Sequence, residues 1–143
     1  MKHLPDIFSR IQQFNRMYGL PTPNRPIFEG VERLVRFREI ISEEVKEADD
    51  ILSKFVNKDT PEVELLTDLA DWLGDMIVYC LSEGARAGLP MEMVLHTIMD
   101  SNFSKLGEDG QPIIVNGKVQ KGPNYWKPEP KIKKLLEEIL NHE

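Results

Sequence analysis

The sequence predicts an all-α fold, an antiparallel bundle of four to five helices with a small C-terminal β-hairpin. Long segments carry apolar residues at every third or fourth position, as amphipathic helices do. Glycines and prolines stand at the ends of these segments and favour their termination there. The pair Asn116-Gly117, flanked by apolar residues, is typical of a two-residue type I′ hairpin turn. We expect residues 1–143 to form a single domain, with residues 112–141 as an appendage.

Each expected element has its own local signals. Gly19 ends the first helix, and three nearby prolines then make a stiff connector. Pro61 suits the first turn of the third helix, while Gly88 and Pro90 separate it from the fourth. The expected helices cover about residues 6–18, 31–56, 61–87, 90–105 and 130–141, and the hairpin covers residues 112–120.

Composition narrows the class of protein. Hydrophobic residues make up 41% and charged residues 29% of the chain, as in ordinary globular proteins. The net charge of −6 argues against sequence-independent nucleic-acid binding. Cys80 is the only cysteine, which excludes an internal disulfide and a cysteine-based zinc site. No apolar run reaches the roughly 18 residues of a membrane span. We expect a cytoplasmic protein that binds neither nucleic acid nor membrane.

The segment 31–56 has one anomaly, a glutamate in its apolar stripe. With about 100° of rotation per residue, Glu44 falls about 20° from the centre of the stripe marked by Phe37, and Glu47 lies at its edge. Glu43 points away from the stripe. Because an unpaired buried charge is costly, the pattern predicts that a positive group meets Glu44.

The segment 61–87 has an apolar stripe and, on another side, an acidic one with Asp68, Asp71 and Asp75. If this helix packs antiparallel to the segment 31–56, four carboxylates converge. Two of them at about 4 Å repel by roughly 4 kcal/mol at an effective dielectric of 20. Oxygen ligands alone favour Mg²⁺, with Mn²⁺ as a second choice, over zinc. The two acidic pairs together therefore predict a metal site.

Two structural alternatives compete with a metal. Each acidic pair taken alone is common on a solvated helix face. Glu44 could also pair with an arginine from another helix or subunit, for which Arg86 is one candidate. In that case the protein is a non-catalytic helical binding module, whose acids need no cation. Calorimetry with Mg²⁺ or Mn²⁺ separates the two hypotheses.

The motif Glu43-Glu44-x-x-Glu47, followed by an acidic helix with Leu73-Gly74-Asp75, resembles the all-α nucleoside triphosphate pyrophosphohydrolases, which include MazG-like proteins and phosphoribosyl-ATP pyrophosphohydrolase. The resemblance covers about residues 7–105, and the closing segments resemble one MazG-like subgroup. It implies Mg²⁺-dependent cleavage of a nucleoside triphosphate, NTP or dNTP, between the α and β phosphates. The alternative within the superfamily is hydrolysis of phosphoribosyl-ATP.

The resemblance also implies roles for single residues. Glu44, Glu47 and Asp75 match metal ligands of the family. The family's other glutamate falls at Trp72, which offers no oxygen, so Asp71 or Asp68 must take its place. Catalytic roles fall to Glu47 and to Glu43, as a base or a supporting ligand.

The substrate-binding candidates are mostly near the C-terminus. Asn102 and Lys105 match substrate-contacting residues of the family, and Tyr125 is a candidate for stacking on the base. Arg38 is the fourth candidate. Phe14, Asn15, Tyr18 and Asn24 flank the proline-rich connector and are candidates for a base pocket.

The expected assembly is a homodimer or a dimer of dimers, because the third helix has apolar surface on too many sides for one neighbour. The family tends to assemble in the same way. The sequence does not specify the preferred base or sugar.

Overall fold

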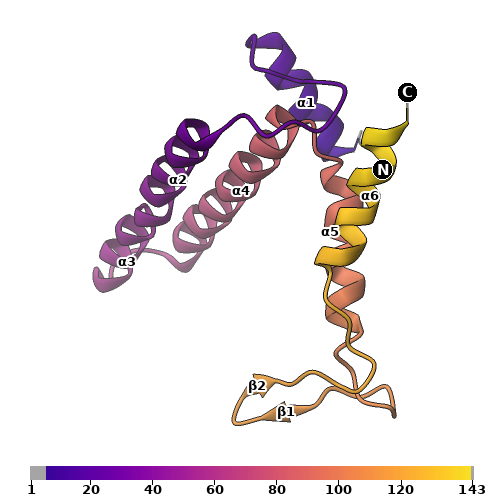
Figure 1. Cartoon of the computed structure of the whole chain (residues 1–143). Coiled ribbons are helices and arrows are strands. Elements are labelled where there is room, and N and C mark those ends of the chain that lie inside the picture. The colour runs from indigo at the N-terminus through magenta and orange to yellow at the C-terminus, as the bar shows by residue number, and fades with distance from the viewer. Residues whose placement is uncertain (1–5, 143) are drawn as a thin grey trace. The chain divides into compact units, whose positions relative to one another are not determined.

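The computed structural model describes residues 6–142. Within them lie six α-helices and one two-stranded antiparallel sheet (Figure 1), which confirms the all-α class with a small hairpin. The elements are α1 (Ile7–Met17), α2 (Val31–Lys46), α3 (Ala48–Val56), α4 (Glu62–Arg86), α5 (Met91–Phe103), β1 (Ile114–Val115), β2 (Lys118–Val119) and α6 (Glu129–Asn141).

The chain divides into two compact units, one ending at Leu89 and one beginning at Pro90. The boundary therefore precedes α5, whereas the sequence suggests an appendage that starts at residue 112. The organisation of the chain as a single domain stays a prediction.

In the first unit, α2 and α3 run along one side of α4, which returns in the opposite direction (Figure 1). The turn between α3 and α4 is closed by a hydrogen bond from the Thr60 N–H to the Asn57 carbonyl, at 3.1 Å. Periodicity predicts one continuous helix over the segment 31–56. The structure instead interrupts it at Glu47, between α2 and α3.

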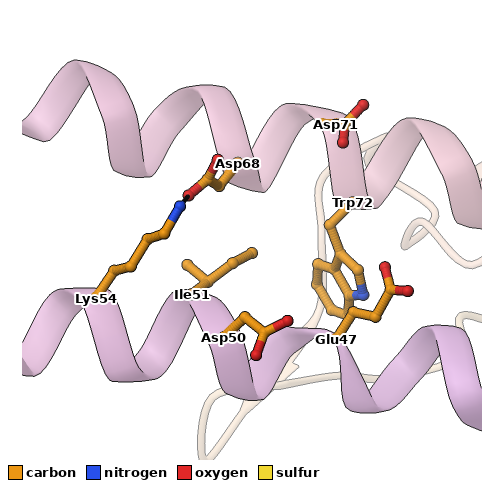
Figure 2. A pocket seen from close by; sticks show the side chains of 7 residues that line it. All are labelled: Glu47, Asp50, Ile51, Lys54, Asp68, Asp71 and Trp72. Atoms are coloured by element: carbon orange, nitrogen blue, oxygen red, sulfur yellow. Dashed lines mark hydrogen bonds and ion pairs between the residues drawn. The ribbon is translucent and has the colours of Figure 1, made fainter.

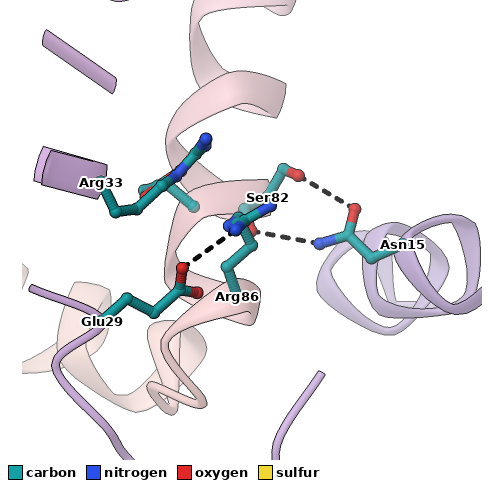
Figure 3. Close-up of polar contacts among 6 residues, drawn as sticks. Asn15, Glu29, Arg33, Ser82 and Arg86 are labelled. Carbon is teal, nitrogen blue, oxygen red and sulfur yellow. Dashed lines mark hydrogen bonds and ion pairs between the residues drawn. The ribbon is translucent and has the colours of Figure 1, made fainter. Parts of the chain in front are cut away.

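The buried apolar side chains of the described chain lie where α1 meets the C-terminal part of α4; they are Phe8, Ile11, Leu81 and Ala85. A polar pair completes this contact. Asn15 on α1 and Ser82 on α4 form two hydrogen bonds to each other (Figure 3). The core of the first unit is therefore small and lies at one end of α4.

Helices α1 and α4 end in the same way, with a glycine in the left-handed region, as expected. Gly19 has φ 69° and Gly88 has φ 67°. The Gly88 N–H donates to the Ala85 carbonyl and the Leu89 N–H to the Gly84 carbonyl, which is the Schellman motif. A Cβ at position 88 would also clash with the backbone of the proline-rich connector.

The second unit pairs α5 with α6 and carries the hairpin. Asn116 and Gly117 have φ values of 52° and 75°, so the predicted type I′ turn is confirmed. The Gly122 N–H donates to the carbonyl of Lys105, at 2.8 Å. A Cβ at position 122 would overlap the Leu106 carbonyl, so the loop packs directly on the chain that follows α5.

The apolar stripe of α4 is exposed, because α2 and α3 pack along the acidic side of this helix. The exposed fraction is 56% for Leu66, 43% for Leu73 and 59% for Ile77. Exposed apolar patches on a protein surface commonly mark interaction sites. Among the helices of the described residues, none combines the length and the apolar character that crossing a membrane requires.

Candidate metal centre

Glu44 is the buried acid that the sequence predicts. It lies two residues before the end of α2, and only 6% of it is exposed. Its Oε1 atom has no hydrogen-bond partner among residues 6–142. A buried carboxylate oxygen without a donor is unusual, because the desolvation of the charge is not compensated. The site therefore needs a cation or a proton.

Three other carboxylates act on Glu44. Burial raises its pKa, and the negative charge and a side-chain hydrogen bond of Glu47, together with the charges of Asp75 and Asp71, raise it further. Glu47 follows α2 directly, whereas Asp71 and Asp75 come from α4. The antiparallel packing of the two segments thus gathers negative charge from both around one buried group.

A pocket of about 180 Å³ lies beside this cluster, between α3 and α4 (Figure 2). Glu47, Asp50, Asp68 and Asp71 contribute carboxylates to its wall, and Lys54 contributes the amine; Ile51 and Trp72 complete the lining. Four acids and one base line the same small volume. Such a wall favours a cation as the occupant.

Asp68 already has a positive partner. Its Oδ2 lies 2.6 Å from Lys54 Nζ, and this hydrogen bond raises the pKa of Lys54 (Figure 2). Asp71, in contrast, has no ion pair with Lys54, and its negative charge contributes to the raised pKa of Glu44. Of the two acids that could replace the family glutamate, Asp71 is therefore the better placed. The assignment of either as a ligand stays a prediction.

Trp72 ties the two sides of the site together. Its indole Nε1–H donates to the backbone carbonyl of Glu44, at 2.8 Å. The contact spans 28 positions of sequence and joins α4 to the end of α2. A tryptophan between two aspartates of an amphipathic helix suggests a core or subunit contact, and the sequence carries no signal for this bond. Lys54 is also absent from the residues that the sequence predicts for the site. Its position two helical turns after Glu47 could have identified it as a neighbour of that acid.

The carboxylates of this cluster suit a divalent ion, although among the described residues they do not yet form a complete set of ligands. In the described part of the chain, no three His, Cys, Asp or Glu side chains already stand as a ligand set. Glu47, Asp71 and Asp75 are exposed, so their side chains can change rotamer at little cost. These three side chains can turn toward Glu44, whose buried Oε1 atom has no hydrogen-bond partner. Carboxylate oxygens are the ligands that Mg²⁺ prefers.

The arginine alternative finds no support at Glu44. Arg86 binds Glu29, with Nη2 2.9 Å from Oε2, as Figure 3 shows. Arg33 binds Glu83 through two hydrogen bonds, of 3.0 and 2.6 Å. Both pairs lie near the C-terminal end of α4. These arginines therefore stabilise the packing of that end of the first unit.

The remaining candidates in the first unit have varied positions. Glu43 and Arg38 are exposed on α2. Asn15, a base-pocket candidate, is fully buried and bonded to Ser82, so that assignment is wrong. Phe14 and Tyr18 are exposed, and their ring centroids are 4.4 Å apart.

The other candidates belong to the second unit. Asn102 is exposed on α5. Lys105 Nζ lies 6.0 Å from the centroid of the Tyr125 ring, and Lys121 Nζ lies 5.0 Å from it. Two of the predicted substrate contacts therefore lie close together, in a basic and aromatic group.

The comparisons with known proteins support the fold. The chain is similar to a crystal structure from Exiguobacterium sp. 255-15 described as a "putative NTP pyrophosphohydrolase", with a TM-score of 0.53 and 24% sequence identity. The similarity covers 96% of this chain and 98% of the other. No protein-family model and no curated protein matches the sequence. The shared feature is the all-α fold.

Proposed function

We propose that the protein is a Mg²⁺-dependent nucleoside triphosphate pyrophosphohydrolase, which cleaves an NTP or dNTP between the α and β phosphates into monophosphate and pyrophosphate. One observation carries the proposal. The buried carboxylate of Glu44, with an unpartnered oxygen, stands among the charges of Glu47, Asp71 and Asp75. The motif resemblance and the name of the Exiguobacterium structure suggest the same general activity.

The metal would be held by Glu44, Glu47, Asp75 and Asp71, with Asp68 as the alternative to Asp71. When bound, Mg²⁺ supplies charge neutralisation of the triphosphate and a water of lowered pKa. The chain's own part is to hold these oxygens at the end of α2 and along α4, where Glu44 has its backbone tied to Trp72. Mn²⁺ suits the same ligands.

The catalytic roles fall to two glutamates. Glu47 lines the pocket, and its negative charge contributes to the raised pKa of Glu44, so it is close to both the pocket and the buried acid. Glu43 is exposed beside Glu44 and is free to accept the proton of the attacking water. A carboxylate in water-accessible surroundings is a weak base, so Glu43 would become more effective as a base if bound substrate excluded water from it.

The substrate-binding candidates of the second unit are Asn102, Lys105 and Tyr125. Arg38 is a separate candidate in the first unit. The amine of Lys105 offsets negative charge on the leaving pyrophosphate. The ring of Tyr125, flanked by two amines, suits stacking against a base near phosphate groups. These assignments rest on the sequence resemblance and on the proximity of Lys105 to Tyr125.

The active form is proposed to be a homodimer, or a dimer of dimers, in which a second copy covers the exposed stripe of α4. Leu66, Leu73 and Ile77 form the centre of this stripe. Because these side chains are already about half buried, their complete burial would contribute roughly 1 kcal/mol each, about half of the value for a fully exposed side chain. This is the kind of surface that stable oligomers bury.

The direct test is release of pyrophosphate from a panel of canonical and modified nucleotides, with phosphoribosyl-ATP included, in the presence of Mg²⁺. The proposal requires equal amounts of monophosphate and pyrophosphate, and loss of turnover when the metal is chelated. Release of inorganic phosphate alone, or turnover in excess chelator, would contradict it. Cleavage of phosphoribosyl-ATP alone would select the other member of the superfamily.

A further inference from the structure

The interruption between α2 and α3 falls in a segment without the residues that usually break a helix. Lys46, Glu47 and Ala48 are all good helix formers, and neither glycine nor proline occurs between Val31 and Val56. Sharp irregularities in helices normally arise at proline, at glycine, or where another group inserts into the hydrogen-bond ladder. Asp49 and Asp50 favour the start of α3 here, and insertion of a group from outside the segment is the further cause to examine.

The hydrogen bonds at the interruption show which group that is. The Glu47 N–H donates to the Glu44 carbonyl, at 3.1 Å, and the Asp50 N–H donates to the Glu47 carbonyl, also at 3.1 Å. Each bond spans three residues, as in a 3₁₀ turn, and Glu47 has matching angles of φ −63° and ψ −17°. The second donor to the Glu44 carbonyl is the indole N–H of Trp72, at 2.8 Å.

The turn has a consequence for the two glutamates. In a regular α-helix, side chains three positions apart diverge by about 60° around the axis. In a 3₁₀ turn they lie one above the other. Glu44 and Glu47 are therefore directed to the same side of the helix axis, whereas in a continuous α-helix they would diverge.

We propose that Trp72 is a positioning residue, whose N–H holds the 3₁₀ turn and thereby aligns the carboxylates of Glu44 and Glu47 on one metal ion. The inference rests on the proposed function, since it assigns Trp72 to the same site. Trp72 acts through the backbone carbonyl of Glu44 and does not itself bind the ion. Groups that orient metal ligands in this way typically contribute about 10–100-fold to metal affinity.

A purely structural role for Trp72 is the competing explanation, because its ring also lines the pocket with Ile51. The two roles separate when the N–H is removed and the ring is kept. The full-length protein carrying Trp126→Phe retains Trp72 as its one tryptophan, since the sequence has two. Biosynthetic replacement of this tryptophan by 3-benzothienylalanine then exchanges the N–H for sulfur in a ring of similar shape. Trp72→Phe is the genetically simple second variant.

The measurements are Mn²⁺ and Mg²⁺ titrations by calorimetry, backbone NMR chemical shifts of residues 45–50, and thermal unfolding without metal. The Trp126→Phe protein is the matched control. We expect the analogue to bind either ion about 10–100-fold more weakly. Its shifts at residues 45–50 should move toward those of a continuous α-helix. Metal-induced change of Trp72 fluorescence in the control should follow the calorimetric curve.

The outcomes separate this inference from the proposed function. If the control binds metal and the analogue binds it equally well, the positioning role is wrong, while the proposed function stands. If the analogue unfolds at a lower temperature than the control but binds metal with the same affinity, the positioning role is also wrong. Trp72 would then contribute to stability alone. If the control binds no metal, the proposed function fails. The chemical shifts then still decide whether Trp72 holds the turn.

Discussion

The side-chain amide of Asn15 forms two hydrogen bonds with Ser82, one through its nitrogen and one through its oxygen. Asn15 Nδ2 donates to the Ser82 carbonyl at 3.1 Å, and Ser82 Oγ donates to Asn15 Oδ1 at 2.9 Å (Figure 3). Asn15 is fully buried. Because α1 contributes only two buried apolar side chains to this contact, the polar pair also sets its register on α4.

Asn15→Ala should lower the free energy of unfolding by about 1–3 kcal/mol, since the buried groups of Ser82 lose their partners. Urea denaturation measures the loss. Gln13→Ala, on the exposed side of the same helix, is the control and should change stability little. Equal effects of the two substitutions would show that the buried pair does not anchor α1.

Glu47→Gln should fold normally and hydrolyse no nucleotide. The substitution keeps the shape of an exposed side chain but removes the charge of a proposed metal ligand, which is also one of the charges that raise the pKa of Glu44. Pyrophosphate release measures activity, and circular dichroism checks the fold. Turnover at the wild-type rate would defeat the assignment of Glu47 to catalysis.

The substitutions Asp71→Asn and Asp68→Asn distinguish the two possible ligands on α4. The charge of Asp71 contributes to the raised pKa of Glu44, while Asp68 is bound to Lys54. We expect Asp71→Asn to weaken Mn²⁺ binding by an order of magnitude or more and Asp68→Asn to leave it nearly unchanged, as read by calorimetry. The reverse order would assign the ligand to Asp68 and require Lys54 to release it.

Glu44→Gln should raise the melting temperature of the metal-free protein, because it removes a buried charge that three neighbouring acids repel. The variant should gain no stability from Mg²⁺. The wild type, in contrast, gains about 2.7 kcal/mol at a metal concentration of about 100 times its Kd. Glu43→Gln, its exposed neighbour, is the matched control for stability. A lower melting temperature for Glu44→Gln than for Glu43→Gln would contradict the electrostatic argument.

The difference in stability between Glu44→Gln and the metal-free wild type should depend on pH. The folded-state pKa of Glu44 is raised above its ordinary value of 4.5, so the folded protein binds this proton more tightly than the unfolded chain does. The contribution of Glu44 to stability is therefore favourable only in acid and falls as the pH rises from 4.5 through the raised pKa. The advantage of Glu44→Gln over the metal-free wild type should thus be largest at neutral pH and vanish below about pH 4.5. Thermal melts across this range measure it.

Leu73→Lys and Ile77→Lys should turn a dimer into a monomer, because each places a charge on the exposed stripe of α4. Size-exclusion chromatography with light scattering measures the mass. Val119→Lys adds the same charge to the exposed hairpin and serves as the control. A wild-type protein that runs only as a monomer at micromolar concentration would count against the assembly.

Local rules are enough to predict most of the fold. Gly19, Gly88 and the pair Asn116-Gly117 act through their own backbone conformations, which neighbouring sequence reveals. The burial of Glu44 follows from its angle on the helix. The same test, applied to the first helix, finds Asn15, which lies four residues after the buried Ile11 and seven after the buried Phe8.

The interruption at Glu47 could not be predicted, because it involves a hydrogen bond from a residue 28 positions away. The pairing of Lys54 with Asp68 likewise depends on how α3 lies against α4. Periodicity also shows the two faces of α4 without deciding which of them α2 and α3 cover. In each case the missing information is a contact between helices.

Gly122 is a position at which the packing of the backbone restricts substitution. Its α-carbon rests on the backbone just after Lys105, and the loop that it begins leads within three residues to Tyr125. Even alanine at this position must push that backbone away. Although glycine carries no functional group, position 122 should therefore tolerate replacement as poorly as Lys105 and Tyr125, which it keeps close together.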